Sequence, residues 1–222
     1  PALDSAKVHT IRNGIDSKRF APNFNPAVAE KYRITAPYAI FVGRITRQKG
    51  LAHLLRAWQN IPEEFGLVLA AGSPDEPAIG AEVEKLVSEL QSSRKNVIWI
   101  KEMLVHDELT SLLTGARAFL CPSIYEPLGI VNLEAMACET AVVASAVGGI
   151  PEVVEDGETG VLVEYSKDGR EFVSALSQAI LRVMSDETLA NSMGKKGRQR
   201  VIDYFGWDKV AKQTVDLYRS LI

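Results

Sequence analysis

The chain has 222 residues, of which 46% are hydrophobic and 24% are charged, a balance typical of globular proteins and unlike that of disordered or collagen-like chains. Its 28 acidic and 25 basic residues give a net charge of -3, so no broad positive field is expected to attract nucleic acid or a membrane surface. Two widely spaced cysteines and the lack of a long apolar run exclude a disulfide scaffold, a zinc site and a membrane span, and favour a cytoplasmic location.

Residues 1–36 are predicted to form an interdomain segment and not part of a core, because they contain few apolar runs and several prolines. A short strand-like run at Val8–Ile11 is the exception. The chain begins without Met and reaches this run at once. We therefore expect it to be a piece of a longer protein.

From Tyr38 onward, short apolar runs alternate with helical patterns, which predicts successive βαβ units. The predicted strands are Tyr38–Gly43, Leu67–Ala71, Val97–Ile100, Ala118–Cys121, Ala141–Ala144 and Gly160–Val163. The helices expected between them are Gly50–Asn60, Pro77–Gln91, His106–Thr114, Ile130–Cys138 and Ile150–Val154. Because several strands are apolar almost throughout, both of their faces should be buried. The predicted fold class is α/β, with a doubly wound parallel sheet.

After Tyr165 the pattern changes to helices alone, predicted at Gly169–Met184, Asp186–Tyr204 and Trp207–Leu221. The chain is accordingly divided into an interdomain segment (1–36), a Rossmann-like core (37–165) and C-terminal helices (166–222).

Basic side chains follow the first predicted strand in the segment GRITRQKG, residues 43–50. In open α/β sheets, ligands bind at the carboxyl ends of the strands, where helix N-termini favour anions. Arg44 and Lys49 together suit a diphosphate, because Arg offers a planar fork and Lys a mobile point charge. A solvated basic loop is the alternative.

Two glutamates flank a Pro-Leu-Gly turn after the fourth predicted strand, in PSIYEPLGIVNLEAMA, residues 122–137. Glu134 would lie about one turn inside the next helix, where it could accept two hydrogen bonds from a ribose diol. The N–H groups of Leu128, Gly129 and Ile130 are expected to point into the same cleft, which Gly129 lets a ligand approach closely. Alternatively, Glu134 is a helix-surface residue and Glu126 a partner of the helix dipole.

A third glycine-rich segment, VGGIPE at residues 147–152, favours a tight turn, with phosphate or sugar contact as the second possibility. Neither a dinucleotide-binding G-x-G-x-x-G nor a P-loop occurs. The three histidines are scattered, and no cluster has metal-ligand spacing. The sequence therefore predicts neither a cofactor nor a metal.

In combination, these segments resemble the GT-B glycosyltransferases of the large family that includes bacterial glycogen synthases and sucrose synthases. The similar segments are NGID with Phe20, FVGRITRQKG, the two-glutamate segment, and ASAVGGIPEVV with DGETG. They occur in the family's order and cover most of the chain. The amino-acid sequences of these segments are most similar to those of glycogen synthases of actinobacterial type. The resemblance implies the donor-binding half of a GT-B fold with a C-terminal helical tail.

The resemblance also assigns roles to residues. Arg44 and Lys49 would hold the donor diphosphate, Gly43 would be a further contact of the donor, and Glu134 would hold the nucleotide ribose. Met103 would pack on the base, while Glu126 would lie beside the sugar and act with Arg44 and Lys49 in catalysis. Transfer would retain the anomeric configuration by front-face attack, without metal, and the cations would stabilise the leaving diphosphate.

Two departures from the family accompany this resemblance. Glu139-Thr140-Ala141 stands where the family often has Gly-Thr-Pro. The N-terminal domain that supplies the acceptor site has no counterpart in this chain, so the fragment alone is expected to be inactive.

The leading hypothesis is the donor-binding domain of a glycogen synthase that transfers glucose from ADP-glucose to an α-1,4-glucan or makes a short maltosyl product, with UDP-glucose as a possible donor. The glucan acceptor would bind through the N-terminal domain. The alternatives are the same fold with another UDP- or GDP-sugar and a different acceptor, a non-catalytic nucleotide-binding module, and a purely structural interaction domain.

Overall fold

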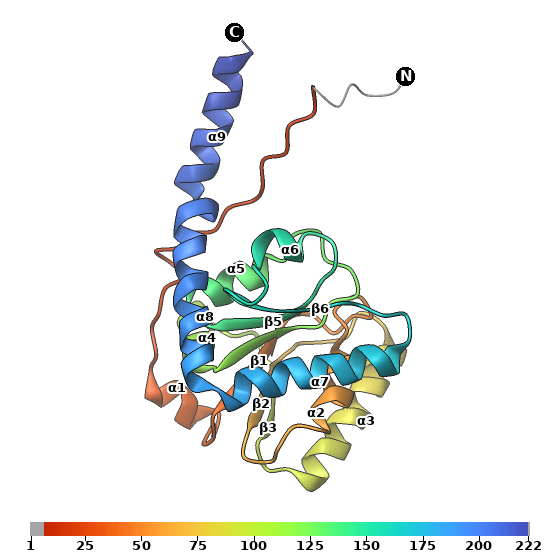
Figure 1. The fold of residues 1–222 in the computed structure, drawn as a ribbon. Coiled ribbons are helices and arrows are strands. Elements are labelled where there is room, and N and C mark those ends of the chain that lie inside the picture. The colour runs from red at the N-terminus through yellow and green to blue at the C-terminus, as the bar shows by residue number, and fades with distance from the viewer. Residues whose placement is uncertain (1–6, 222) are drawn as a thin grey trace.

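Parallel strands form the centre of the computed structural model, which describes residues 7–221 (Figure 1). The strands of these residues are β1 (Tyr38–Val42), β2 (Gly66–Ala70), β3 (Val97–Ile100), β4 (Ala118–Cys121), β5 (Ala141–Ser145) and β6 (Gly160–Val163). They lie in one six-stranded sheet in the order β3-β2-β1-β4-β5-β6, and every pairing is parallel. All six predicted strands are present, and the predicted fold class is confirmed.

Helices cover both faces of the sheet. Those between the strands are α2 (Leu51–Trp58), α3 (Pro77–Ser93), α4 (His106–Gly115), α5 (Ile130–Ala137) and α6 (Ile150–Val153). The chain then continues through α7 (Gly169–Ser185), α8 (Glu187–Arg200), a π-helical turn (Val201–Phe205) and α9 (Trp207–Ser220). The single helix predicted over Asp186–Tyr204 is therefore divided into α8 and the π turn.

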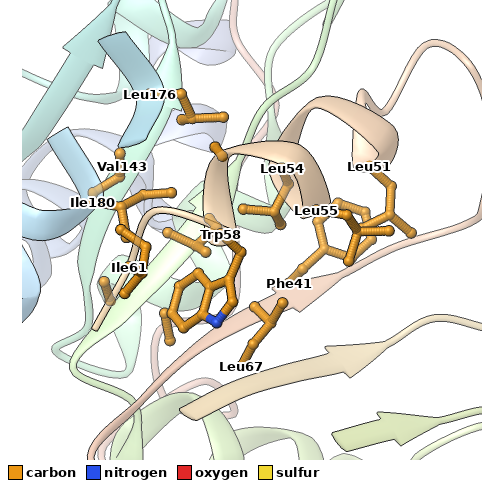
Figure 2. Close-up of a cluster of buried hydrophobic side chains, with 14 of the residues drawn as sticks. Phe41, Leu51, Leu54, Leu55, Trp58, Ile61, Leu67, Val143, Leu176 and Ile180 are labelled. Atoms are coloured by element: carbon orange, nitrogen blue, oxygen red, sulfur yellow. The ribbon is translucent and has the colours of Figure 1, made fainter. Parts of the chain in front are cut away.

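The strands contribute side chains to two separate hydrophobic clusters, one on each face of the sheet, because successive side chains of a strand point to opposite faces. In β1, Ala39 and Phe41 join the cluster beneath α2, α3 and α7, whereas Tyr38 and Ile40 join the one beneath α4 and α5. Figure 2 shows the first cluster, in which the fully buried Trp58 of α2 lies among aliphatic side chains. Burial on both faces explains why these strands are apolar throughout.

The N-terminal segment differs from the prediction in two ways. Val8–Ile11 forms no strand: the segment runs outside the sheet, and Val8 is largely exposed. An apolar run becomes a strand only where a neighbouring strand supplies ladder hydrogen bonds. In addition, a short helix, α1 (Pro26–Lys31), begins where Asn25 accepts a hydrogen bond from the N–H of Ala27 and Pro26 takes the first helical position. Residues 1–6 of the predicted interdomain segment lie outside the described part.

The N-terminal segment and the turn before α9 meet beside the core. The N–H of Ile15 donates to the carbonyl of Phe205 at 2.8 Å, and Ile15 forms a parallel bridge with Gly206. Beyond this point α9 extends away from the sheet next to the N-terminal segment, and none of its residues is buried (Figure 1). Among residues 7–221, no helix is both long enough and apolar enough to cross a membrane.

The departure at Glu139 has a visible consequence at the end of α5. Glu139 adopts a left-handed φ of 63°, which glycine adopts without the steric cost that a side chain adds. The N–H of Thr140 donates to the carbonyl of Ala135 at 3.0 Å and closes this turn. A glycine would fit the turn better than Glu139, and the ligand-binding candidates are not involved.

Candidate functional site

The strand order reverses direction between β1 and β4, since β1 pairs with β2 on one side and with β4 on the other. The loops that leave the carboxyl ends of these two strands therefore meet at the topological switch point, where open α/β sheets bind ligands. The first is the basic segment 43–50, called the phosphate loop below. The second, residues 122–129, carries Glu126 and is called the glutamate loop.

One backbone and one side-chain hydrogen bond hold the two loops together. The N–H of Ile124 donates to the carbonyl of Gln48 at 2.8 Å, and the side-chain amide of Gln48 donates to the carbonyl of Tyr125 at 2.9 Å. Gly50 ends the phosphate loop with a φ of 65°, and a Cβ at this position would overlap the carbonyl of Pro122. Only glycine allows the backbones to approach so closely at this point.

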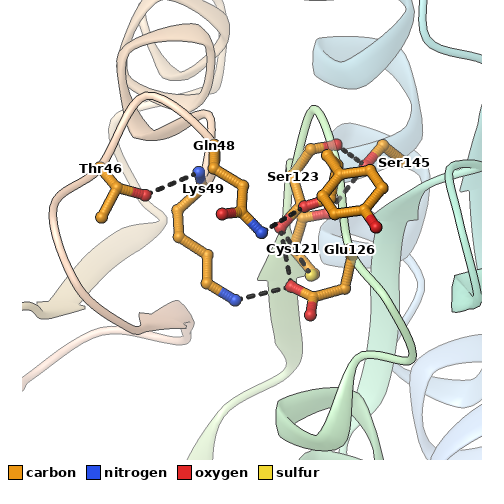
Figure 3. Close-up of polar contacts among 8 residues, drawn as sticks. Thr46, Gln48, Lys49, Cys121, Ser123, Glu126 and Ser145 are labelled. Carbon is orange, nitrogen blue, oxygen red and sulfur yellow. Dashed lines mark hydrogen bonds and ion pairs between the residues drawn. The ribbon is translucent and has the colours of Figure 1, made fainter.

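Lys49 and Glu126 form an ion pair between the loops. The Lys49 Nζ lies 2.6 Å from the Glu126 Oε2, and the side chains are only 18% and 10% exposed. The Ser123 hydroxyl donates to the same carboxylate oxygen at 3.4 Å, and the backbone of Ser123 is itself held by a hydrogen bond from the Ser145 hydroxyl. Figure 3 shows Lys49 reaching from one loop to Glu126 on the other.

The glycine pair predicted as a tight turn supports Glu126 from its other side. The N–H of Gly149 donates to the backbone carbonyl of Glu126 at 2.9 Å. Gly148 has a φ of 55°, and a Cβ there would overlap the same carbonyl. Three loops, from β1, β4 and β5, thus fix the position of this carboxylate.

The remaining basic side chains of the phosphate loop also face acids. Arg44 lies 3.2 Å from Asp75 and Arg47 lies 3.6 Å from Glu76. Arg44 is 73% exposed and Asp75 is 44% exposed, so water screens this pair and allows Arg44 to turn to another partner. The loop therefore carries positive charge that is already balanced by neighbouring carboxylates.

An open cavity of about 520 Å³ lies next to Arg44. Residues at or after the ends of β1, β2 and β3, together with Leu109 of α4, line it: Val42, Gly43, Arg44, Ala70, Gly72, Ser73, Lys101, Glu102, Met103, Leu104 and Leu109. Gly43 and Arg44 are thus brought together with Met103, whose side chain is 95% exposed. Sequence reasoning missed Gly72 and Ser73, although a Gly-Ser pair after the second strand marks a loop at the same edge.

Helix α5 begins at the glutamate loop with Gly129 in a left-handed conformation, φ 87°, and with no side-chain cap. A helix start without a cap leaves N–H groups available to an anion. Ile130, at the first helical position, is exposed, and Leu128 is partly exposed. Asn132 is a further residue that sequence reasoning missed: it is fully buried, and its amide has no hydrogen-bond partner among the described residues.

Glu134 is partly buried on α5, about one turn after the helix begins at Ile130, as the sequence predicts. Burial raises the pKa of this carboxyl above its ordinary value, and the nearby His106 opposes the shift. Desolvation disfavours the charged form of a carboxyl group. A partly buried carboxyl group with a raised pKa, on a helix that starts at the carboxyl ends of the strands, is typical of a functional position.

We expect Glu134→Gln to raise the free energy of unfolding near neutral pH. Because the folded-state pKa is raised, the ionised carboxylate destabilises the fold above that pKa, by about 1.4 kcal/mol for each pKa unit of elevation. Below the unfolded-state value both states are protonated, so the difference between variant and parent should vanish there. Thermal melts between pH 4 and pH 8 test this. A melting difference that does not change with pH would contradict it.

Among residues 7–221, no group of three or more His, Cys, Asp or Glu side chains is arranged to hold a metal ion. The structure arranges the candidate residues in three sets. Lys49 and Glu126 are in direct contact, while Gly43, Arg44 and Met103 line the cavity. Leu128, Gly129, Ile130 and Glu134 lie along the glutamate loop and α5.

Comparison with known proteins gives consistent results. The family model described as glycosyl transferases group 1 matches residues 27–200. The alpha-maltose-1-phosphate synthase of Mycolicibacterium smegmatis is 46% identical over 228 residues, which cover 100% of this chain and 59% of that protein. The glycogen synthase of Mycobacterium tuberculosis is 32% identical over 215 residues, which cover 96% of this chain and 48% of that protein.

A similar solved structure is that of sucrose-phosphate synthase from Thermosynechococcus elongatus. It superimposes with a TM-score of 0.79 at 35% identity, over 95% of this chain and 52% of that one. The chain thus spans about half the length of the relatives that it matches.

Proposed function

This chain belongs to the glycosyl transferases group 1, and we propose that it is the donor-binding part of a retaining glucosyltransferase that uses a nucleotide sugar. The observation that carries the proposal is the pairing of Lys49 with Glu126 across the switch point, with Lys49 on the same loop as Arg44, which lines the cavity. A cation that can bind phosphate and a carboxylate that can bind sugar hydroxyls then lie side by side, as the junction between the diphosphate and the sugar of a nucleotide sugar requires.

In this proposal the diphosphate lies along the phosphate loop, where Arg44 and Lys49 stabilise the negative charge that develops as the bond from the sugar C1 to the leaving phosphate breaks. The N–H groups at the start of α5 add to this stabilisation. Glu134 binds the ribose hydroxyls, and the base enters the cavity near Met103. The acceptor hydroxyl oxygen forms its bond to C1 on the face that the diphosphate leaves, and its proton passes to an oxygen of the departing phosphate. We propose that this step needs no metal.

We propose that the reaction makes a short saccharide and does not elongate a long glucan. The 46% identity to an alpha-maltose-1-phosphate synthase exceeds the 32% identity to a glycogen synthase. A synthase of that product joins two glucose units, one of which carries a phosphate. Elongation of an α-1,4-glucan is the second candidate, and ADP-glucose is the favoured donor in both.

The domain division proposed from the sequence completes this picture. Residues 37–165 would be the donor-binding core, flanked by the segments 1–36 and 166–222. The acceptor would bind to a further domain of the longer protein. We propose that this domain contacts the exposed helix α9. Because positioning of both substrates supplies much of the rate, the chain alone should bind the donor but not transfer sugar.

Calorimetric titration with ADP-glucose, UDP-glucose and a GDP-linked sugar tests the proposal. We expect saturable binding with one preferred base, unchanged by a chelator, and tightest for the adenine nucleotide. Titration of the same ligands into a sample with Glu134→Ala should show weaker binding, because a ribose partner is lost. If no nucleotide sugar binds to folded chain, the proposed function is wrong; if only the uridine nucleotide binds, the donor assignment is wrong.

A further inference from the structure

The ammonium group assigned to the donor diphosphate already has a carboxylate partner. Lys49 donates to Glu126 at 2.6 Å, in a setting where both side chains are mostly buried. A phosphate oxygen that takes this ammonium competes with Glu126 for it. The cost of that competition depends on what the Glu126 carboxylate contacts afterwards.

Few groups can replace Lys49 as a partner of Glu126. Within the described residues, the Ser123 hydroxyl at 3.4 Å is the other side chain that donates to the carboxylate. The N–H of Gly149 binds the backbone carbonyl of Glu126 and not its side chain. A largely buried carboxylate that loses its cation incurs a large desolvation penalty.

We propose that the Lys49–Glu126 ion pair makes the site favour an intact nucleotide sugar over a free nucleoside diphosphate, an inference that rests on the proposed function. Sugar hydroxyls can donate to Glu126 when a phosphate oxygen takes Lys49, so the intact donor compensates the carboxylate. A nucleoside diphosphate has no sugar beyond its second phosphate and leaves Glu126 uncompensated. The product of transfer therefore binds more weakly than the donor, which favours its release.

The Arg44–Asp75 pair offers a matched control, because it joins a second basic residue of the phosphate loop to a second carboxylate. Both of its members are well exposed, at 73% and 44%. Water can solvate Asp75 when Arg44 turns to a phosphate, so this pair should have little influence on affinity. Asp75→Asn and Glu126→Gln remove one negative charge each, from an exposed and a buried pair respectively.

The experiment is calorimetric titration of ADP and ADP-glucose into the parent chain, Glu126→Gln and Asp75→Asn, each shown to be folded by circular dichroism. Glu126→Gln should bind ADP more tightly, on the order of tenfold, because Lys49 no longer has a charged competitor. Its affinity for ADP-glucose should rise less or fall, so that the ratio of the two dissociation constants moves toward one. Asp75→Asn should change each constant by less than about twofold.

Three outcomes would overturn the inference. Glu126→Gln could bind ADP no more tightly than the parent does, or Asp75→Asn could tighten ADP binding equally, which would indicate a general charge effect. Either result leaves the proposed function standing, provided that the parent binds ADP-glucose. If the folded parent binds neither nucleotide, the proposed function fails and this inference fails with it.

Discussion

Gly50→Ala should cost about 2–5 kcal/mol of unfolding free energy, the sum of a left-handed conformation for a non-glycine residue and of forced overpacking. Gly50 has a φ of 65°, and a Cβ there would overlap the Pro122 carbonyl. The obstacle is backbone and not a flexible side chain, so the phosphate and glutamate loops must separate. Lys49, the neighbouring residue, should then lose its contact with Glu126, and nucleotide affinity should fall as well.

Gly157→Ala is the control for backbone strain alone. Gly157 has a similar φ of 77°, but no described atom lies within 4 Å of a Cβ built on it. Its substitution should cost about 1–2 kcal/mol and leave nucleotide binding unchanged. Chemical denaturation of both variants gives the comparison. Equal destabilisation by the two substitutions would show that the close approach of the loops at Gly50 is not important for stability.

Lys49→Met should weaken ADP binding by about 1.5–3 kcal/mol, the range for hydrogen bonds to charged groups. It should also lower stability by roughly 2–3 kcal/mol, somewhat less than for a fully buried pair, because Glu126 loses its cation. Methionine preserves the length and packing of the lysine stem, so both losses report the charge. Titration and denaturation of the same preparation measure the two effects.

The double variant Lys49→Met with Glu126→Gln separates these effects. Replacing both charges removes the unpaired carboxylate, so most of the lost stability should return. ADP affinity should remain low, since the cation for the diphosphate is still missing. Recovery of ADP binding in the double variant would mean that Lys49 acts only through Glu126 and does not contact phosphate.

Continuous hydrophobicity explains why the sheet was predictable. A strand buried on both faces, such as Ala118–Cys121, needs an apolar residue at every position, and its short length distinguishes it from a buried helix. Val8–Ile11 is apolar only at its two ends and forms no strand, and strand formation also depends on a neighbouring strand. Local capping could have indicated α1, since Asn25-Pro26 is a helix start signal.

The sequence predicts where the candidate site lies, but not which of its residues contact one another. The strand-to-helix loops identify the ligand edge, and residue types there indicate phosphate and hydroxyl binding. Lys49 and Glu126 are 77 residues apart in sequence, so their pairing depends on strand order. The sequence does not indicate that Asn132 is buried without a hydrogen-bond partner, because its burial depends on how α5 packs against the rest of the chain.

The central claim is that the nucleotide binds at the switch point between β1 and β4. A crystal structure of the chain with bound ADP tests this most directly. We predict the diphosphate within hydrogen-bond distance of the Lys49 ammonium and the Arg44 guanidinium, the ribose hydroxyls on Glu134, and the adenine in the cavity near Met103. ADP bound elsewhere, or at this edge with its phosphates away from Lys49, would contradict the account.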